Sequence, residues 1–411
     1  MSMEVDEEIV IVGAGIAGLA TALGLHRLGL KCLVLESSPS LRAAGYAFTA
    51  WTNAWKALDE LGVGDPVREQ HNRLERLVTI STSLGVQTGE ITFTTTKTGM
   101  KHEVRCIRRK ILLETMAKEL PSGTIRFSSK MVSVEDSGGL KLVHLADGSI
   151  LKAKVLIGCD GVNSAVATRL GFQKPSFSGR SIIRGFNVFK EGHGFEPQLL
   201  QFIGEGIRCG IIPCDDSSIY WFVSFSALSR DPELEVNPLK MKQFVLNNLG
   251  KVPDKARNVI ETTKSDEVIY CSLLYRSPWE MLWGDINKDN VCVAGDAFHP
   301  MTPDLGQGAC AALEDGVVLA RCLAQAFRKG TPGERISKEE EYEKIKISLN
   351  NYSKERRWRG FDLVTTAYLV GAMQQSNNKL IAFLRDKVLG PFIVAMIMKR
   401  AVFDCGRLKT L

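Results

Sequence analysis

Three glycines near the N-terminus have the spacing of a dinucleotide-binding turn. Gly13, Gly15 and Gly18 follow an apolar, strand-like run and precede a run of helical periodicity. In such a turn the first glycine allows a tight bend, the second lets the backbone approach a diphosphate, and the third lets the helix pack closely on the strand. The free N–H groups at the start of the helix favour the same anion. The spacing therefore predicts dinucleotide binding, with a purely structural turn as the alternative.

A glutamate lies where the adenosine ribose of such a dinucleotide would bind. Glu36 ends the next apolar run, about 20 residues beyond the turn, and Ser37 follows it. A carboxylate at this position can accept hydrogen bonds from the ribose. Because an acid favours an unphosphorylated ribose, the sequence indicates FAD or NAD at this site rather than NADP.

Two further features carry weaker signals. An apolar run ends in Cys159-Asp160-Gly161, and the simplest interpretation is a buried strand that leads into a turn. Arg109 precedes a run of helical periodicity, where a single arginine is usually solvated. Neither feature indicates a site without further information.

The most informative stretch covers residues 293–308, with the sequence VAGDAFHPMTPDLGQG. A buried strand ends in a Gly-Asp pair, so Asp296 can point at a ligand hydroxyl group. Pro300 and a second proline stiffen the loop that follows. A helix then begins, and its first N–H groups can face a carbonyl group or a diphosphate. The residues that open this helix are Gly306, Gln307 and Gly308.

His299 lies in the same stretch and is either a catalytic base or a structural hydrogen-bonding residue; we favour the structural role. The ten cysteines and six histidines are dispersed and show no ligand spacing, so we expect no metal site. Several cysteines lie inside apolar runs, which indicates buried, reduced thiols and a reducing compartment.

The composition is typical of a globular enzyme. Of the 411 residues, 45% are hydrophobic and 24% are charged, and the length suggests two or three units that share cores. The net charge of +6 is not concentrated in basic runs, which argues against nucleic acid as a partner. We find no pattern of a signal peptide, transit peptide or transmembrane segment, so the expected location is the cytoplasm.

The elements that must position these residues indicate an α/β fold in which one domain interrupts another. A strand, a helix and a parallel strand are expected at 8–12, 16–28 and 31–35. Strand-like runs between turns in the middle of the chain indicate a mainly antiparallel sheet. The expected segments are a nucleotide-binding domain at 1–180 with a β excursion at about 76–98, an inserted β-sheet substrate domain at 181–275, the second part of the nucleotide-binding domain at 276–345, and a C-terminal helical segment at 346–411.

Periodicity predicts further elements in these segments. We expect helices at 49–61, 110–120 and 308–327, strands at 77–82 and 90–95, and helical structure from about residue 338 onward. Residues 380–403 are apolar with interleaved basic residues, which allows peripheral contact with a membrane. Helices packed over the nucleotide-binding domain are the alternative that we favour.

Together, the three motifs resemble the class A flavin-dependent aromatic hydroxylases of the para-hydroxybenzoate hydroxylase fold. Within this family the sequence is most similar to salicylate-hydroxylase-like and zeaxanthin-epoxidase-like members, including plant-type monooxygenases. The order and spacing of the motifs agree over about residues 8–357. The resemblance implies a Rossmann-like FAD-binding domain, an inserted β-sheet substrate domain and C-terminal helices.

The resemblance also assigns FAD contacts to the matching positions, and Asp160 is further linked to NAD(P)H. The implied FAD-binding residues are Gly13, Gly15, Ile16, Ala17 and Gly18 at the diphosphate, Glu36 and Ser37 at the adenosine ribose, Arg42, Arg109 and Asp160 nearby, Asp296 at the ribityl chain, and Gly306, Gln307 and Gly308 at the isoalloxazine ring.

The activity that the resemblance implies is a monooxygenase reaction that uses NAD(P)H and O2. A C4a-hydroperoxyflavin would hydroxylate or epoxidise a small aromatic or electron-rich apolar substrate beside Pro300. Many family members have a catalytic histidine or tyrosine on the inserted sheet, but residues 206–213 contain neither. Arg208 or Tyr220 would serve instead, which leaves hydroxylation and epoxidation open.

Two other functions are compatible with the sequence. One is an FAD-dependent oxidoreductase of another reaction class, a reductase or an oxidase. The other is a non-catalytic FAD-binding protein. We expect a small-molecule substrate and a monomer or homodimer.

Overall fold

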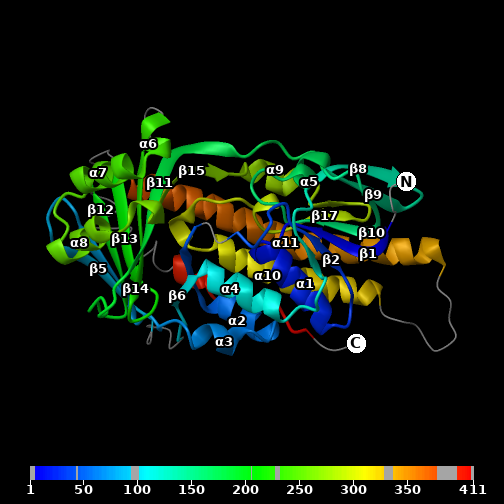
Figure 1. The fold of residues 1–411 in the computed structure, drawn as a ribbon, viewed down its shortest axis with the longest axis horizontal. Coiled ribbons are helices and arrows are strands. Elements are labelled where there is room, and N and C mark those ends of the chain that lie inside the picture. The colour runs from blue at the N-terminus through cyan, green and yellow to red at the C-terminus, as the bar shows by residue number, and fades with distance from the viewer. Residues whose placement is uncertain are drawn as a thin grey trace.

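The computed structural model describes residues 5–42, 45–93, 101–204, 206–226, 232–327, 337–376 and 396–408. Two large sheets form the two ends of an elongated molecule, and long helices run beside the first sheet towards the second (Figure 1). No helix in the described ranges combines the length and the apolar character needed to cross a bilayer.

The N-terminal unit is a strand, a helix and a parallel strand. β1 (Val5–Val12) leads through the glycine turn into α1 (Ile16–Arg27), and β2 (Leu33–Leu35) returns beside β1 in parallel. All the residues of α1 from Ile16 to Leu25 are buried, because the helix packs between the sheet and a second helix. This unit was expected from the sequence.

The first sheet has eight strands with a parallel centre. β10 (Ile150–Gly158) lies between β1 and β17 (Val291–Val293), and both pairings are parallel. An antiparallel pair of strands extends this sheet from β10. The other members of the sheet are β2, β7 (Ile125–Arg126), β8 (Met131–Ser137), β9 (Leu140–Leu145) and β16 (Asn287–Lys288).

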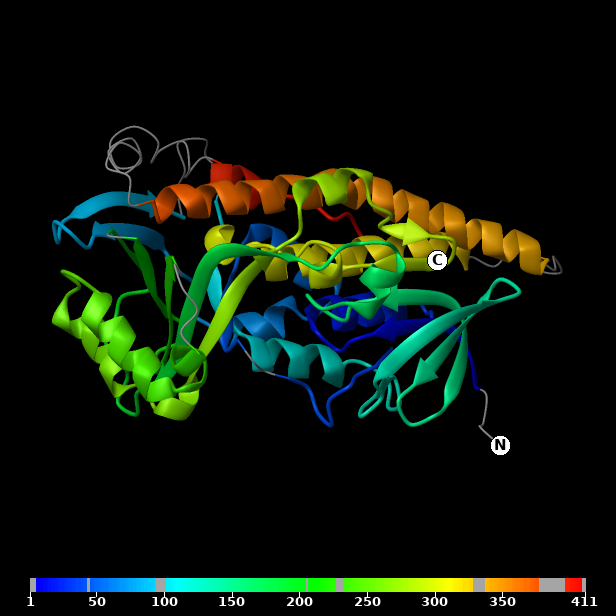
Figure 2. The same ribbon diagram turned by 90° about the horizontal axis from the view of Figure 1, so that it is seen from above.

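One long buried helix, α10 (Gly308–Ala326), packs against α1 at very short range. Glycines make this approach possible, since a Cβ atom at Gly24 would lie 2.8 Å from the Ala320 Cβ atom and one at Gly316 would overlap Ala20. The helix that follows, α11 (Lys338–Gln374), runs along the side of α10 (Figure 2).

The second sheet has seven strands and is mainly antiparallel. One edge of this sheet is β15 (Val268–Tyr275). The other edge is formed by the β excursion expected at about 76–98, which was assigned to the nucleotide-binding domain but pairs with this second sheet. The inner strand β12 (Gln198–Gly204) pairs in parallel with β4, so segments more than 100 residues apart are joined. The remaining strands are β4 (Arg76–Ser81), β5 (Gln87–Thr92), β11 (Ser176–Val188), β13 (Ile207–Pro213) and β14 (Ser218–Ser226).

Three helices cover one face of the second sheet and form a separate hydrophobic core with it. They are α6 (Pro232–Val236), α7 (Pro238–Asn248) and α8 (Asp254–Thr262). The opposite face is directed towards the motifs that are predicted to bind the dinucleotide, and residues such as Tyr220 and Phe222 join the main core from it. The inserted region is therefore a sheet with one helical layer.

Smaller elements connect the two ends. β3 (Ala47–Ala50) pairs with β6 (Arg105–Arg108) in a two-stranded sheet, and α9 (Pro278–Trp283) lies on α11. The other helices are α2 (Thr52–Glu60), α3 (Gly64–Arg68), α4 (Arg109–Lys118) and α5 (Ala165–Arg169).

Several expected boundaries differ from the structure. The helix expected at 49–61 is preceded by β3, and only its later part, α2, is helical. The strand expected at 90–95 ends at Thr92, and residues 94 and 95 lie outside the described residues. α11 begins at Lys338, where helical structure was expected, and it continues past residue 346, where the C-terminal segment was expected to begin. Most of 380–403, where membrane contact was considered, also lies outside the described residues.

Candidate functional site

The carboxyl ends of three parallel strands bring the three predicted motifs to one edge of the first sheet. Val12 pairs with Gly158, and Gly158 pairs with Val293, so the chain leaves β1, β10 and β17 at the same level. The glycine turn, the Asp160 turn and the Asp296 loop follow these three ends. Ligands of open α/β sheets bind at such an edge.

Glycine is present at the three positions of the turn for different physical reasons. A Cβ atom at Gly13, whose φ is +103°, would overlap the carbonyl oxygen of Cys159, and one at Gly18 would overlap the carbonyl oxygen of Gly13. At Gly15 a Cβ atom would meet no atom within 4 Å. Packing within the protein therefore requires Gly13 and Gly18, whereas Gly15 leaves open space beside the start of α1.

Glu36 is buried next to this turn. Its Oε2 atom accepts a hydrogen bond from the Ala14 N–H at 3.0 Å, and its Oε1 atom accepts one from the Ser38 N–H at 2.8 Å. The exposed Arg42 lies 3.4 Å from the same carboxylate, and the Ser37 hydroxyl donates to it at 3.3 Å. The backbone thus fixes the carboxylate at the edge of the open space, and its contact with a ribose stays a prediction.

Asp160 lies just before the short helix α5, whose N-cap residue is Ser164. The Asp160 carboxylate accepts hydrogen bonds from the Ala165 N–H at 2.7 Å and from the Ser164 hydroxyl at 2.5 Å. The preceding carbonyl group, that of Cys159, faces Gly13. Asp160 therefore holds the turn that supports the glycine turn. The nearby Arg169 donates to Asp136 at 2.6 Å, so it does not supply a positive charge at this edge.

Arginines gather where the first sheet meets the second. Gly45 lies beside the guanidinium groups of both Arg109 and Arg184, since a Cβ atom there would be 3.7 and 3.6 Å from their Nη1 atoms. Burial lowers the pKa of Arg109, and the charge of the exposed Asp296 opposes this shift. Arg109 is thus half-buried and faces an acid across the site, unlike the solvated arginine that such a position usually holds.

The loop between β17 and α10 ends in a helix start without a side-chain cap. Gln307 occupies the N-cap position, but its side chain makes no capping hydrogen bond; its Oε1 atom accepts from Asn53 at 2.8 Å. The Nε2 atom of Gln307 and the hydroxyl group of Thr302 are buried without a hydrogen-bond partner. Buried donors of this kind are normally satisfied, and a ligand bound beside this loop would supply an acceptor for them.

A buried cluster of two arginines and one aspartate joins this loop to the second sheet. Arg180 donates to both oxygens of Asp304, at 3.0 and 2.8 Å, and Arg208 donates to one of them at 3.2 Å. The Asp304 side chain has no exposed surface. The cluster therefore carries one positive charge in excess, on the sheet face that meets the loop. The Nε atom of Arg208 is buried without a partner.

Tyr220 lies on the same side of the second sheet. Burial raises the pKa of its hydroxyl group to about 12, although the neighbouring Arg184 opposes the rise. The hydroxyl group is therefore neutral over the physiological range. Its ring lies 6.2 Å from that of Phe222, over which the guanidinium group of Arg208 stacks at 5.2 Å. The structure thus places both predicted sheet residues, Arg208 and Tyr220, on one face.

Sequence reasoning missed Arg180, Arg184 and Asp304. Asp304 was visible as an acid between two prolines and glycines in the informative stretch, which was a usable signal. Arg180 and Arg184 share one face of β11 with Ile182 and Phe186, so the sequence of this strand shows no polar face that would single them out. Their roles depend on pairing with segments more than 80 residues away.

Two histidines, one of them His299, are held by structural hydrogen bonds. His299 is fully buried, and its Nε2 atom lies 2.6 Å from the Asp315 carboxylate, which also accepts from Gly295 N–H and Arg356. In the glycine-flanked loop, His193 bonds the carbonyl oxygen of Asp215 and the N–H of Phe195. The Asp315 network therefore fixes the backbone on both sides of Asp296, in agreement with the structural role favoured for His299.

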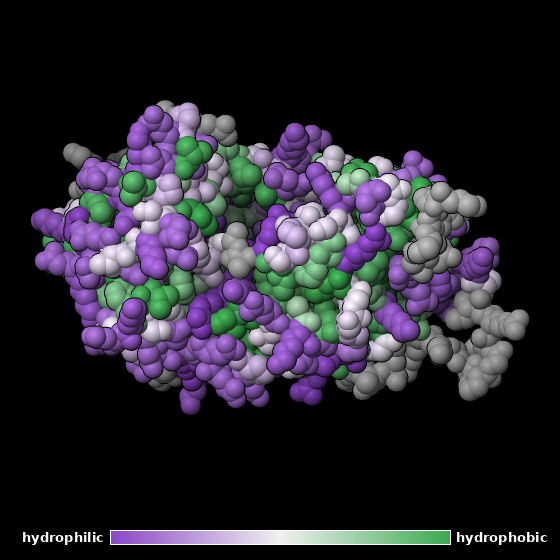
Figure 3. All heavy atoms as spheres, in the orientation of Figure 1, coloured by the Kyte–Doolittle hydropathy of each residue, from purple (hydrophilic) through white to green (hydrophobic). Residues whose placement is uncertain are grey.

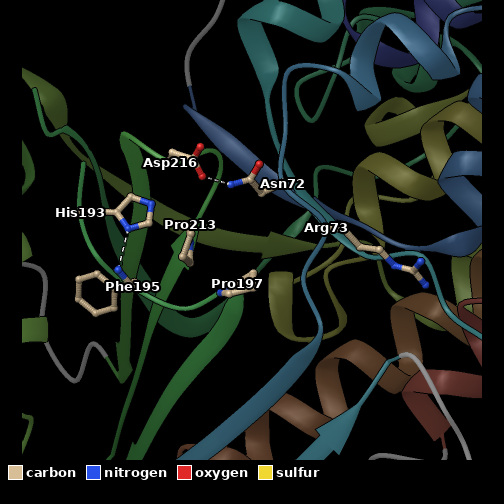
Figure 4. A pocket seen from close by; sticks show the side chains of 7 residues that line it. All are labelled: Asn72, Arg73, His193, Phe195, Pro197, Pro213 and Asp216. Carbon is tan, nitrogen blue, oxygen red and sulfur yellow. Dashed lines mark hydrogen bonds between the residues drawn. The ribbon is translucent and has the colours of Figure 1, made fainter. Parts of the chain in front are cut away.

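A cavity of about 290 Å³ lies away from these residues, at one end of the second sheet. Its lining includes His193 and Asp216, and the Asn72 side chain donates to Asp216 at 2.6 Å (Figure 4). None of the predicted FAD or substrate residues lines it. Its polar groups are satisfied within the protein, so we do not assign the reaction to it. Another feature is a recess between the two halves of the molecule, with hydrophobic residues gathered beside it in the region of α1 (Figure 3).

The residues at the sheet edge fit FAD. The open position at Gly15 and the uncapped start of α1 suit a diphosphate, and Glu36 lies where a ribose would be. The unpartnered Gln307 donor and the start of α10 suit the polar edge of a flavin ring. Within the described residues, no group of three or more acidic, cysteine or histidine side chains has the arrangement of a metal site.

Comparisons with known proteins agree with this geometry. A family model described as an FAD binding domain matches residues 6–345. Monooxygenase 2 of Arabidopsis thaliana is 52% identical over 410 residues, which cover 99% of this chain and 100% of that protein. Monooxygenase 1 of the same plant is 36% identical, with 97% and 99% covered. Among solved structures, Klebsiella pneumoniae HpxO with FAD and uric acid has a TM-score of 0.81 at 23% identity, with 98% of each chain covered.

Proposed function

The chain belongs to the FAD-binding family of flavoprotein monooxygenases, with their Rossmann-like α/β fold, and from this premise we propose that it uses NAD(P)H and O2 to hydroxylate or epoxidise a small aromatic or electron-rich substrate. One observation carries the proposal. Three motifs from distant parts of the sequence meet at one sheet edge, beside the open space at Gly15 and opposite a substrate-facing sheet. When bound, FAD would accept a hydride and activate O2.

The residues that would hold FAD are the ones at this edge. The N–H groups at the start of α1 would bind the diphosphate, and Glu36 would bind the adenosine ribose. Arg109 is close enough to Arg184 and Asp296 for their charges to affect its pKa, and it would compensate phosphate charge on the same side. Gln307 would donate its free Nε2–H to the flavin ring, and Pro300 would hold the loop beside it.

The substrate would lie between this loop and the second sheet. Arg208 carries the excess positive charge of the buried cluster, so it favours an anionic or strongly polarised substrate oxygen. Tyr220 keeps its proton because burial raises its pKa to about 12, and it therefore acts as a hydrogen-bond donor or as a partner of Arg184. Neither residue needs to act as a general base for a substrate that binds already ionised.

Exclusion of water is the second contribution of the protein. Every residue of β13 and almost every residue of β14 is buried, so the sheet presents an apolar wall around Arg208 and Tyr220. A dry site would limit the release of activated oxygen as H2O2, and it would strengthen the charge interactions of the arginines.

Substrate-stimulated cofactor oxidation tests the proposal. Purified protein should bind FAD and become yellow, and a panel of phenols, aromatic carboxylates and N-heterocycles should contain compounds that accelerate NAD(P)H oxidation. Failure to bind FAD after reconstitution would overturn the proposal. Acceleration that yields one H2O2 per NAD(P)H with every compound, and no altered compound, would instead identify an oxidase.

A further inference from the structure

A network of buried polar side chains ends at Gln307, the N-cap residue of α10. It joins three helices, because Asn53 lies on α2, Glu314 lies on α10 and two arginines lie on α11. The side chains of Asn53, Gln307 and Glu314 belong to residues that are at most 1% exposed, so their polar atoms need partners from the protein or from a ligand. The identity of these partners decides how the two amide groups are oriented.

Glu314 is an ionised carboxylate that can only accept hydrogen bonds. Arg359 donates to both of its oxygen atoms, at 2.8 and 3.1 Å, and Arg356 lies 2.8 Å from one of them. Burial raises the pKa of Glu314, but the charges of the two arginines outweigh it and bring the pKa below its ordinary value. A neutral side chain that contacts this carboxylate must therefore do so through a donor.

The orientation of Gln307 follows from that of Asn53. The Asn53 Nδ2 atom donates to Glu314 Oε1 at 2.5 Å, so the Asn53 amide must present its NH2 group to the carboxylate. The second hydrogen of this NH2 group is donated to Gln307 Oε1 at 2.8 Å. Gln307 must therefore present its carbonyl oxygen to Asn53, and its own NH2 group remains available as a donor.

The contact between the two amides is incomplete. Two side-chain amides that only stabilise a fold can form a reciprocal pair, in which each NH2 group donates to the carbonyl oxygen of the other. Asn53 and Gln307 make one of these two bonds, and in the described part of the chain neither Asn53 Oδ1 nor Gln307 Nε2 has a partner. Buried unpartnered atoms cost free energy. The arrangement therefore suits a donor held for a ligand, at the helix start that fits the polar edge of a flavin ring.

We propose that Asn53 and Glu314 are positioning residues, which hold Gln307 so that its Nε2–H group donates to an acceptor on bound FAD. The inference rests on the contact between Gln307 and the flavin ring put forward above, and it does not depend on the reaction with O2. Reduction adds negative charge to a flavin ring, so a donor at its polar edge stabilises the reduced form. The network should therefore make the midpoint potential of bound FAD more positive.

A double-mutant cycle tests this arrangement in the full-length protein. Asn53→Leu removes both donated hydrogen bonds but leaves Glu314 paired with its two arginines, and Gln307→Met removes the donor itself. Each change should weaken FAD binding about tenfold, the effect of one lost hydrogen bond. Each should also make the midpoint potential more negative. Because Asn53 acts through Gln307, the double variant should match Gln307→Met in both quantities.

Asn187→Leu is the matched control, since Asn187 is a buried asparagine that donates to Val259 and Thr262 in the helical layer of the second sheet. This variant should lower the Tm but leave FAD affinity and midpoint potential unchanged. If Asn53→Leu does not fold, Asn53→Ala makes the same comparison with a smaller side chain.

Two results would overturn the inference. One is an Asn53 variant with the FAD affinity and midpoint potential of the wild type. The other is a double variant in which the losses of the two single variants add, because a merely structural Asn53 would act independently of Gln307. Both results require wild-type protein that binds FAD, so a chain that fails to bind FAD would instead contradict the proposed function.

Discussion

The cofactor side and the substrate side of the candidate site are built in different ways. On the cofactor side, residues close together in sequence make the binding geometry: the glycine turn, the start of α1 and Glu36 lie within one β-α-β unit. On the substrate side, Arg180 and Arg208 come from two strands of the second sheet, and Asp304 comes from the loop before α10. The cofactor side therefore depends on backbone geometry, and the substrate side depends on buried charge.

This difference teaches which parts of the site tolerate change. Backbone groups and glycines cannot be replaced without altering the shape of the cradle, so this side is suited to a fixed ligand. Side-chain charges can be changed one at a time, so the substrate side can be adapted to different molecules on the same fold. The predictions below separate the two sides.

The largest effect is expected within the glycine turn itself. Gly18→Ala places a Cβ atom onto the Gly13 carbonyl oxygen and should destabilise the fold by about 3 kcal/mol. Gly15→Ser fills only open space and supplies a good N-cap residue, so the FAD-free protein should keep its Tm. Its affinity for FAD should nevertheless fall on the order of 100-fold, roughly 2.7 kcal/mol.

Thermal melts of the FAD-free variants and fluorescence titration with FAD measure these two effects. If Gly15→Ser binds FAD as tightly as the wild type, the open space beside α1 is not the diphosphate site.

A smaller effect, confined to the substrate side, is expected for Arg208→Gln. Asp304 keeps both hydrogen bonds from Arg180, so the buried carboxylate remains paired and the fold should be retained. FAD affinity should be unchanged, while kcat/KM for an identified substrate should fall about 10- to 100-fold through loss of a charged hydrogen bond. Steady-state kinetics beside an FAD titration separate the two quantities. A variant with unchanged kcat/KM would remove Arg208 from the substrate site.

The smallest effect concerns the network that holds the Asp296 loop. Burial raises the pKa of Asp315, but His299 and Arg356 outweigh it and bring the pKa to about 2, below the ordinary value of 3.8. The ionised carboxylate therefore stabilises the folded state by about 2 kcal/mol above about pH 5, and this contribution is lost as the pH falls through about 2. Urea denaturation at several acidic pH values should show an equal loss for the wild type and for Asp65→Asn, a change at an exposed carboxylate, and a smaller loss for Asp315→Asn, in which other carboxylates with lowered pKa values, such as Glu314, still titrate. An equal loss in Asp315→Asn would contradict this assignment.

The sequence predicted the secondary structure of the cofactor side far better than the contacts on the substrate side. The turn at Gly13 to Gly18, the two strands around it and the buried strand before Asp296 depend on local periodicity and glycine spacing, which the sequence carries directly. The parallel pairing of β4 with β12 depends on contacts across more than 100 residues, which no local pattern encodes. Arg208 was a candidate from the sequence. Its pairing with Asp304 could not be anticipated, because it too is a contact between distant segments.

Oxygen transfer to a product tests the central claim most directly. Once a compound that stimulates NAD(P)H oxidation is found, the reaction is run under ¹⁸O2 and the mass of the product is measured by mass spectrometry. A monooxygenase places one labelled atom in the product for each NAD(P)H consumed, and the second appears in water. An oxidised product without label, or labelled H2O2 as the sole oxygen-containing product, would contradict the proposed function.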